Sequence, residues 1–205
     1  MITLPQSTAV GRNLPKEAFY RRLTLNAELK EKFVGEIRRI ILSNSLTGTT
    51  LNLQAGGEVT EILLLTVELK KALTDYRVIE AIARQNPHKL VFHLQYGEQE
   101  QLALYYGKLY KTPWRPLGCL PLEAKGFTLD GVWDNMVAQI ALNDADLPQS
   151  QNLTVPERIE RQERRERLEK ELTKTERLTR VEKQPKKKFE LYQRVQELTR
   201  ELEDI

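Results

Sequence analysis

The sequence predicts an α/β (α+β) domain with a mixed sheet of about four strands flanked by helices, followed by a C-terminal helical hairpin with a coiled-coil seam. Segments of helical and of strand periodicity alternate up to about residue 145. A polar, proline-containing stretch, NDADLPQSQN, then interrupts the apolar pattern. Beyond it, leucine, valine and isoleucine recur at helical intervals in a highly charged segment. We therefore expect a globular domain over 1–145, a linker over 146–153 and a helical arm over 154–205.

The first elements of the domain are predicted to be two helices. Pro15 suits the first turn of a short helix over 14–23. Asn26 can cap a longer helix over 27–42, because its side-chain oxygen can accept a hydrogen bond from an N–H of the first turn. The apolar residues of this second segment fall on one helical face: Leu29, Phe33, Ile37, Ile40 and Ile41.

Two strands and a third helix are expected next. The segments TTLNLQ (49–54) and VTEILLLTVEL (59–69) have strand composition, with the turn AGGE between them. The second segment is apolar at consecutive positions, which is typical of a central strand covered on both faces. Thr74 is then placed to cap a helix over 75–85, which Asn86 and Pro87 end.

A strand hairpin and a last helix complete the predicted domain. Alternation in KLVFHLQY (89–96) predicts a strand, and the turn GEQE returns the chain through QLALYYGKLY (101–110). The proline-bearing stretch over 111–126 is expected to lie on the surface. Thr128 can cap the last helix, over 129–142, whose core-facing stripe is Val132, Met136 and Ile140.

Composition excludes several classes of protein. The 205 residues carry a net charge of only +3, so no global field draws the chain to nucleic acid or to an anionic membrane. The opening MITLPQSTAV lacks the basic start and apolar core of a signal peptide, and the longest aliphatic run, ILLL, is too short to cross a bilayer. The single cysteine, Cys119, rules out an internal disulfide and fits a reducing compartment. We expect a cytoplasmic protein with no membrane partner.

The charged arm is predicted to be helical rather than a nucleic-acid-binding or disordered tail. From residue 156 to 205 it carries 15 Lys or Arg against 13 Asp or Glu, and the signs are interspersed instead of forming blocks. Thr154 and Glu157 have the spacing of a capping box, with Pro156 in the first turn. Because Pro185 must interrupt a helix, we expect an antiparallel hairpin that turns there.

The second half of the arm has an apolar edge that needs a cover. Its apolar residues alternate four and three apart, as in a coiled-coil seam, and a two-helix hairpin by itself has a thin core. The seam is expected to face its own domain, a second copy or another protein, and its partner-binding residues are Leu191, Val195, Leu198 and Leu202. The basic tip that follows Pro185 is either solvated or a phosphate contact, and consists of Lys186, Lys187 and Lys188.

One constellation indicates a catalytic alternative. VELK places Glu68 and Lys70 two residues apart at a strand end, and a helix and another strand follow. This resembles the core of the PD-(D/E)xK nucleases, in which an acidic pair binds Mg²⁺ and the lysine positions a water molecule. The resemblance implies a Mg²⁺ site with Glu61, Glu68 and Lys70 and offers Glu36 as a helix carboxylate, but the family's Asp has no counterpart in TTLNLQ. We therefore favour a non-catalytic protein without metal or cofactor.

Aromatic and basic residues interleave in YYGKLYKTPWR. Bases stack on aromatic rings and lysines contact phosphates, so Lys108 and Lys111 are candidates for direct nucleic-acid contact. The alternative is that the rings anchor a strand end and a loop into the core. Trp114 and Arg115, from the end of this segment, are our candidates for docking a protein partner on the domain.

Five segments of the chain occur together and in this order: LPQSTAVGRNLPKEAFY, VELKKALTDYRVIEAIARQNPHKLVFHLQY, TPW, GFTLDGVWDNMVAQIA and EKQPKKKFELYQRVQELTREL. Together they resemble an uncharacterised bacterial and archaeal family, a domain of unknown function, over almost the whole chain. The resemblance implies genes encoded beside helicases and DNA methyltransferases in restriction-like anti-phage loci. It carries over no catalytic residue.

These observations lead us to expect a non-catalytic accessory or scaffold subunit of a DNA-processing or anti-phage defence complex. Its α/β domain and its C-terminal helices would dock a large protein partner such as a helicase or a DNA methyltransferase, and a second copy of the chain is another candidate partner. Contact with DNA would be indirect or weak. The alternatives are a Mg²⁺-dependent nuclease of the PD-(D/E)xK type and a direct DNA-binding module.

Overall fold

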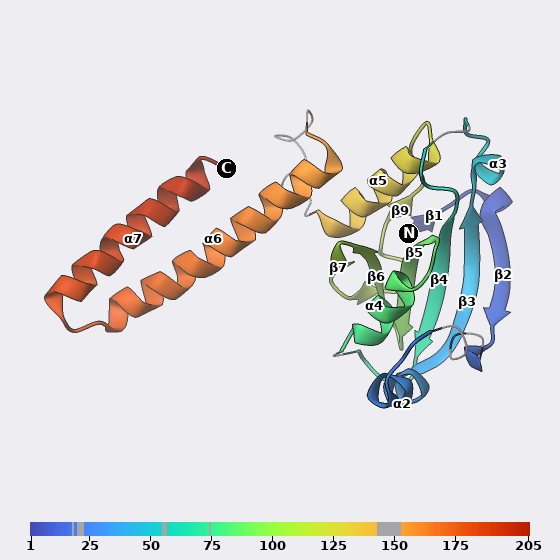
Figure 1. Cartoon of the computed structure of the whole chain (residues 1–205), viewed down its shortest axis with the longest axis horizontal. Coiled ribbons are helices and arrows are strands. Elements are labelled where there is room, and N and C mark those ends of the chain that lie inside the picture. The colour runs from blue at the N-terminus through green and yellow to red at the C-terminus, as the bar shows by residue number, and fades with distance from the viewer. Residues whose placement is uncertain (18, 20–22, 55–56, 74, 143–152) are drawn as a thin grey trace. The chain divides into compact units, whose positions relative to one another are not determined.

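The structure is a computed structural model that describes residues 1–17, 19, 23–54, 57–73, 75–142 and 153–205. The chain divides into two compact units, Met1–Asn143 and Asp144–Ile205. The first unit combines a sheet with helices, and the second is a pair of helices (Figure 1). The predicted linker over 146–153 lies, except for Leu153, outside the described residues.

A mixed sheet forms the centre of the first unit, and over the described residues it has seven strands. Only β4 and β5 are parallel neighbours among these strands, and the other pairs are antiparallel. Along the sheet the order is β2 (Ala9–Leu14), β3 (Ile37–Leu46), β4 (Ile62–Leu69), β5 (Lys89–Tyr96), β6 (Gln99–Tyr106) and β7 (Lys108–Lys111), with β8 (Arg115–Pro116) also paired to β6. A separate parallel pair joins β1 (Ile2–Thr3) to β9 (Leu122–Glu123).

The mixed α+β architecture is confirmed, and the prediction of about four strands was wrong. Two of the additional strands are β3, which lies in a segment predicted to be helical, and β7, which follows a turn at Gly107. QLALYYGKLY is not a single strand, because Gly107 turns the chain with φ +72° and separates β6 from β7. The edge strand β2, over residues that carry no alternating apolar pattern, was not predicted at all.

Helices cover both faces of the sheet. One face packs against α2 (Ala27–Glu36) and α4 (Arg77–Arg84) in a cluster that includes Phe33, Ile79 and Phe92. Successive strand residues point to opposite faces, so the buried Val91, beside Phe92, belongs to the other face. There α5 (Leu129–Ala141) contacts β6 and β7 through a buried stripe of Val132, Met136 and Ile140, as predicted.

The predicted helix over 27–42 begins as expected and ends early. Asn26 Oδ1 accepts a 2.8 Å hydrogen bond from Leu29 N–H, which confirms the cap. The helix stops at Glu36, and the predicted second half is β3, whose Ile37 and Ile40 are buried in the core. Isoleucine is a good strand former, and pairing with β4 prevails over the local helical spacing.

The predicted strand over 49–54 was also wrong, because this segment begins with the short helix α3 (Gly48–Leu51). Thr47 and Thr50 form a capping box, in which each side chain accepts a hydrogen bond from the backbone of the other. The helix ends at Asn52, which adopts the left-handed conformation with φ +51°. The side chains of Thr47 and Thr50 therefore accept hydrogen bonds from the backbone N–H groups at the start of the helix, a role that a neighbouring strand would have in a sheet.

Two predicted helix starts fall partly outside the described residues. In the segment 14–23, residues 16, 17 and 19 are helical, and 18 and 20–22 are not described. Thr74, the predicted cap of α4, is likewise not described. The predicted cap of α5 is confirmed, because Thr128 Oγ1 accepts a 3.2 Å hydrogen bond from Gly131 N–H.

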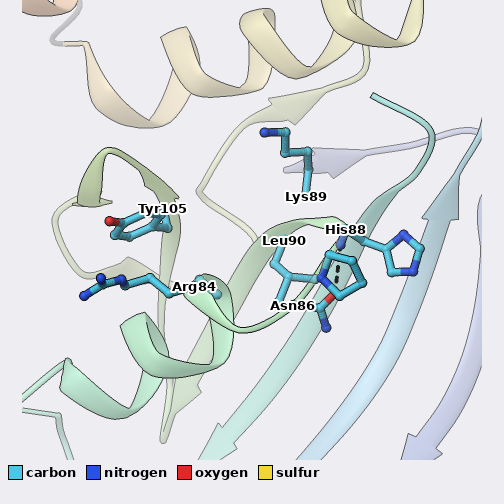
Figure 2. A pocket seen from close by; sticks show the side chains of 8 residues that line it. Arg84, Asn86, His88, Lys89, Leu90 and Tyr105 are labelled. Atoms are coloured by element: carbon cyan, nitrogen blue, oxygen red, sulfur yellow. Dashed lines mark hydrogen bonds between the residues drawn. The ribbon is translucent and has the colours of Figure 1, made fainter. Parts of the chain in front are cut away.

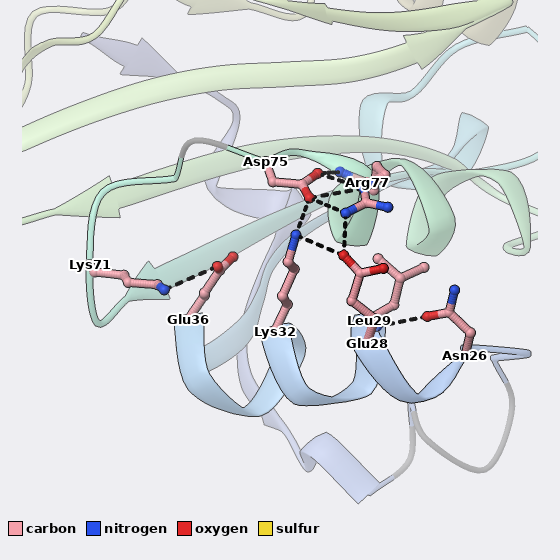
Figure 3. Close-up of polar contacts among 8 residues, drawn as sticks. All are labelled: Asn26, Glu28, Leu29, Lys32, Glu36, Lys71, Asp75 and Arg77. Atoms are coloured by element: carbon pink, nitrogen blue, oxygen red, sulfur yellow. Dashed lines mark hydrogen bonds and ion pairs between the residues drawn. The ribbon is translucent and has the colours of Figure 1, made fainter.

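A charged network joins α2 to the start of α4 (Figure 3). Asp75 accepts hydrogen bonds from the side chain of Lys32, from Arg77 N–H at 3.0 Å and from Arg77 Nη2 at 2.6 Å. Arg77 Nη2 also lies 2.6 Å from Glu28 Oε1. The hydrogen bonds from Arg77, together with that from Lys32, hold the pKa of Asp75 well below its usual value. Asp75 therefore fixes the first turn of α4 against α2.

The second unit consists of α6 (Val155–Val181) and α7 (Pro185–Glu203), which pack against each other. As predicted, Thr154 and Glu157 form a capping box. The Arg161 guanidinium donates to the carbonyl oxygen of Ile205, and Arg194 Nη2 lies 2.9 Å from Glu171 Oε1. Residues early in α6 thus meet residues late in α7, so the helices run antiparallel.

The helices of the hairpin are strongly charged. At about 1.5 Å per residue, α6 is roughly 40 Å long and α7 roughly 30 Å. In the described part of the chain, no helix combines the length and the apolar composition needed to span a bilayer.

Substitution of Asp75 by alanine is expected to lower the free energy of unfolding by about 1–2 kcal/mol, since it removes the acceptor of the first turn of α4 and leaves Lys32 without this partner. Urea unfolding followed by circular dichroism measures the change. Glu80→Ala is the control on the same helix, because Glu80 forms only an exposed 3.7 Å pair with Arg84 and should cost about 0.5 kcal/mol or less. Equal effects of the two substitutions would contradict the role of Asp75.

Candidate functional site

The polar residues at the two ends of β4 include those that the nuclease alternative requires. Glu61 precedes the strand, whereas Glu68 and Lys70 lie at its C-terminal end. At about 3.3 Å per residue, Glu61 is roughly 23 Å from Glu68 along the strand. The structure therefore brings Glu68 and Lys70 to one end of β4 and leaves Glu61 at the other.

The elements around Glu68 have the order that the nuclease resemblance implies, because α4 follows β4 and leads to the parallel strand β5. The strand that precedes β4 is β3, and the residue opposite Glu68 is Arg39. The Arg39 guanidinium forms an ion pair with the Glu68 carboxylate. A Mg²⁺ site of two carboxylates needs a second acid near the first, and at this position the chain has a cation instead.

Lys70 and Glu36 connect this end of the sheet to α2. Lys70 Nζ donates a 2.8 Å hydrogen bond to the carbonyl oxygen of Val34, and Lys70 N–H donates a 2.7 Å bond to that of Glu36. Both carbonyls belong to the last turn of α2, where the helix itself supplies no donors. The buried Glu36 carboxylate lies 3.3 Å from Lys71 Nζ. Lys70 therefore acts as a C-terminal cap of α2.

Glu61 makes different contacts at the other end of β4. Its Oε1 accepts a 2.5 Å hydrogen bond from Ser45 Oγ, and its Oε2 lies 3.2 Å from His88 Nδ1. Glu61 thus connects β3 to the residue before β5. Over the described residues, no three side chains of His, Cys, Asp or Glu come close enough together to hold a metal ion.

A polar row crosses five strands on one face of the sheet. Direct register pairs join Arg39 to Glu68, Glu68 to Gln95, Gln95 to Glu100 and Glu100 to Arg115. Side chains of directly opposed residues lie on the same face, about 5 Å apart at Cβ. We call these five residues the polar row. At each end of the row an arginine lies opposite a glutamate, Arg39 with Glu68 and Arg115 with Glu100, so the formal charges of the row cancel.

Glu100 of the polar row forms a pair with His93 that has little solvent contact. His93 Nε2 lies 2.8 Å from Glu100 Oε2, and Glu100 Oε1 accepts a 2.9 Å bond from Leu120 N–H. Burial lowers the pKa of His93, more strongly than Glu100 raises it. Burial alone raises the pKa of Glu100, but the bonds from Leu120 and His93 outweigh it, and the net pKa is lowered. A neutral imidazole therefore donates to an ionised carboxylate, and the pair holds the 117–122 segment on the sheet.

A pocket of about 210 Å³ lies where α4 ends and β5 begins (Figure 2). The Arg84 guanidinium lies 5.9 Å from the centre of the Tyr105 ring, and Lys89 Nζ lies 5.7 Å from that of Trp133. In Figure 2 the side chains of Arg84, His88 and Lys89 point in different directions. Arg84, His88 and Lys89 each face a group of the chain itself and do not converge on a common anion position.

The aromatic–basic segment forms the end of β6 and the edge strand β7. Lys111 Nζ lies 3.8 Å from the ring centre of Tyr76, and Lys108 Nζ lies 4.9 Å from that of Tyr110. Each of these rings therefore has a cation of the chain on its face. A nucleobase would have to displace that cation in order to stack.

The two docking candidates on the domain have different surroundings. Trp114 is partly buried and packs against the hydrophobic core. Arg115 is exposed at the end of the polar row, in β8. Arg115 is thus the better placed of the two for contact with a partner.

The four candidate residues of the arm lie along the face of α7 that meets α6. Leu198 is completely buried, and Leu191, Val195 and Leu202 are partly buried. The register set by Arg161 with Ile205 and by Glu171 with Arg194 brings Leu198 opposite the buried Leu168 of α6. Much of the predicted seam is therefore covered within the hairpin itself.

The turn of the hairpin carries a groove of about 740 Å³, which we call the tip groove. Val181 is 66% exposed and Leu178 is 44% exposed, and both are apolar. Phe189 and Tyr192 are exposed on the neighbouring turns of α7. The apolar side chains that line the tip groove are Leu178, Val181 and Leu191, and the charged ones are Glu182, Lys183, Lys187 and Glu190.

Sequence reasoning missed the tip groove and the polar row. The buried face of α6 follows the spacing of Leu168, Leu172 and Thr175. Leu178 and Val181 fall one residue out of this spacing, and that shift is the sequence signal that they lie outside the contact with α7. The basic residues 186–188 were identified, and all three are exposed at the start of α7. The polar row had no sequence signal, because its residues are known to lie opposite one another only once the register of the strands is known.

Comparison with known proteins gives one match. The family model described as "Domain of unknown function (DUF4391)" matches residues 2–202, which takes in both units. No curated protein and no solved structure matches the chain.

Stability is expected to fall on acidification, and His93 and Glu100 should both contribute. A histidine whose folded pKa is lowered destabilises the fold as pH drops below about 6.5, where the unfolded form takes up the proton. A glutamate with a lowered pKa loses its contribution below about pH 4.5, as it is protonated. Urea unfolding at a series of pH values should show a smaller loss of stability between pH 7 and 5 in His93→Gln than in the native chain. An identical slope in both would contradict a buried neutral imidazole.

Proposed function

This chain belongs to the family of the domain of unknown function DUF4391, and from that premise we propose that it is a non-catalytic accessory subunit of a DNA-processing or anti-phage defence complex. Its domain and its helical hairpin dock a large protein partner of the helicase or DNA methyltransferase type. The observation that carries the proposal is the exposed apolar surface at the tip of the hairpin.

The tip supports a docking role because two of its apolar residues lie outside the buried contact between the helices. Leu168 and Leu198 already form a buried contact between α6 and α7. Leu178 is 44% exposed and Val181 is 66% exposed near the turn, beyond that buried contact. Adjacent exposed apolar side chains with charged neighbours are typical of protein interaction sites.

The contacts at the end of β4 support a non-catalytic role. Glu68 is paired with Arg39, and Lys70 caps α2 through Val34. A nuclease would need both side chains free to act on a metal and a water molecule. In this chain they stabilise the junction of sheet and helix.

A Mg²⁺-dependent nuclease is the second candidate, and one observation favours it. The Glu-x-Lys spacing of Glu68 and Lys70 lies at the end of a strand that leads through α4 to a parallel strand. The Arg39–Glu68 pair is on the surface, so little energy is needed to open it.

Docking can be tested by co-expression with the helicases and DNA methyltransferases of the source genome and, if any, with the products of the neighbouring genes, followed by affinity and size-exclusion chromatography. One of these proteins is expected to co-elute with the chain, and Val181→Asp should reduce the recovered partner about tenfold, because a carboxylate would be buried in the contact. Thr173→Asp, on an exposed position of the same helix, should leave recovery unchanged. Separate elution of the native chain from every one of these proteins would contradict the proposal.

The nuclease alternative predicts cleavage of duplex DNA by the purified chain with Mg²⁺. We expect no cleavage above background, and the same result for Glu68→Ala. Mg²⁺-dependent cleavage that is present in the native chain and lost in Glu68→Ala would favour the nuclease and overturn the non-catalytic assignment. Circular dichroism of the variant serves as the control for folding.

A further inference from the structure

The segment around the tip groove is basic. Between residues 180 and 190 there are five basic side chains and two acidic ones, a net charge of +3. The whole chain also has a net charge of +3, so the remaining residues sum to zero. The local charge of the tip therefore favours an acidic partner.

One of the two acidic side chains in the tip groove is used by the turn itself. Glu182 Oε1 accepts a 2.8 Å hydrogen bond from Gln184 N–H, which fixes the link between α6 and α7. Lys183 and Lys187 line the same groove and are exposed. Two lysines and two glutamates therefore line the groove, and the net positive charge of the tip comes from Arg180, Lys186 and Lys188 beside it.

The floor of the tip groove is apolar, which narrows the class of ligand. Phosphates of a nucleic acid would pair with the lysines but would leave Leu178 and Val181 in water. A protein segment can bury these residues and neutralise the lysines at the same time. At about 740 Å³, the groove has the size of sites that take several side chains.

We propose that the tip groove binds an acidic, amphipathic segment of a partner protein. Apolar side chains of that segment pack on Leu178, Val181 and Leu191, and its carboxylates pair with Lys183 and Lys187. An amphipathic helix in a groove is a common mode of peptide recognition. The inference rests on the proposed docking function and specifies the chemistry of the contact.

The test uses the full chain and a fluorescent, helix-forming peptide with leucine at positions i, i+3, i+4 and i+7 and glutamate elsewhere. Fluorescence anisotropy should show saturable binding that weakens as salt is added. A peptide with lysine in place of glutamate, and a peptide of the same composition with the leucines scattered, should not bind. These two peptides separate charge from amphipathicity.

Two pairs of variants locate the site. Val181→Ser should weaken binding about fivefold or more, whereas Phe189→Ser, equally exposed but outside the groove, should change it less than about twofold. Lys187→Glu should weaken binding at least about threefold, and Lys186→Glu, the same charge reversal one residue away, should have a clearly smaller effect. All four positions are exposed, so the fold should be unaffected.

Failure of the acidic peptide to bind, or equal effects within each pair of variants, would overturn the inference. Duplex DNA and phosphatidylglycerol vesicles are measured alongside. Binding of either one that is lost in Val181→Ser, without peptide binding, would assign the tip to that other class of ligand. If a partner co-elutes and Val181→Asp does not change its recovery, the docking function is supported and this site is refuted. If the peptide binds and no partner co-elutes, the site is supported and the docking function is refuted.

Discussion

Burial of β4 on both faces is the constraint on which the first unit depends. Leu65 and Val67 face the cluster under α2 and α4, and Ile62 and Leu64 are buried on the other side. A strand with two apolar faces requires a layer of helix on each side and strands at both edges. Its charged residues then lie only toward its ends, and the one polar residue within it, Thr66, is satisfied by Ser43 Oγ at 2.7 Å. The Glu-x-Lys pattern is one result of this, since Glu68 and Lys70 mark the place where the strand leaves the core.

The second unit is stabilised in a different way. Two charged helices share a narrow seam, in which Leu198 is completely buried while its neighbours on α7 remain partly exposed. Ion pairs such as Arg194 with Glu171 fix the register and contribute little energy at an exposed position. Apolar side chains that do not fit this seam collect at the turn. The hairpin therefore carries its exposed apolar surface at one end.

Local signals in the sequence predicted the starts of α2, α5 and α6 and the central strand. The elements that depend on pairing between distant segments could not be predicted in this way. The side chains of Asn26, Thr128 and Thr154 act within a few residues, so their capping roles could be read from spacing. The segment IRRIIL has isoleucines at spacings that suit a helix and a strand equally, and only its pairing with β4 decides between them. The tip groove depends on which faces of α6 and α7 pack together, and the sequence of either helix alone does not determine this.

The outer strands of the sheet have a consequence for aggregation. In the described part of the chain these are β2 at one edge and β7 with the two-residue β8 at the other, and a row of free backbone groups at such an edge can recruit another copy without limit. The pairing of β2 with β3 is interrupted by a bulge between Ala9 and Arg12, where Gly11 has φ +66°. At the opposite edge, β7 has only four residues and a lysine at each end. Both edges thus discourage the open-ended sheet growth that leads to fibres.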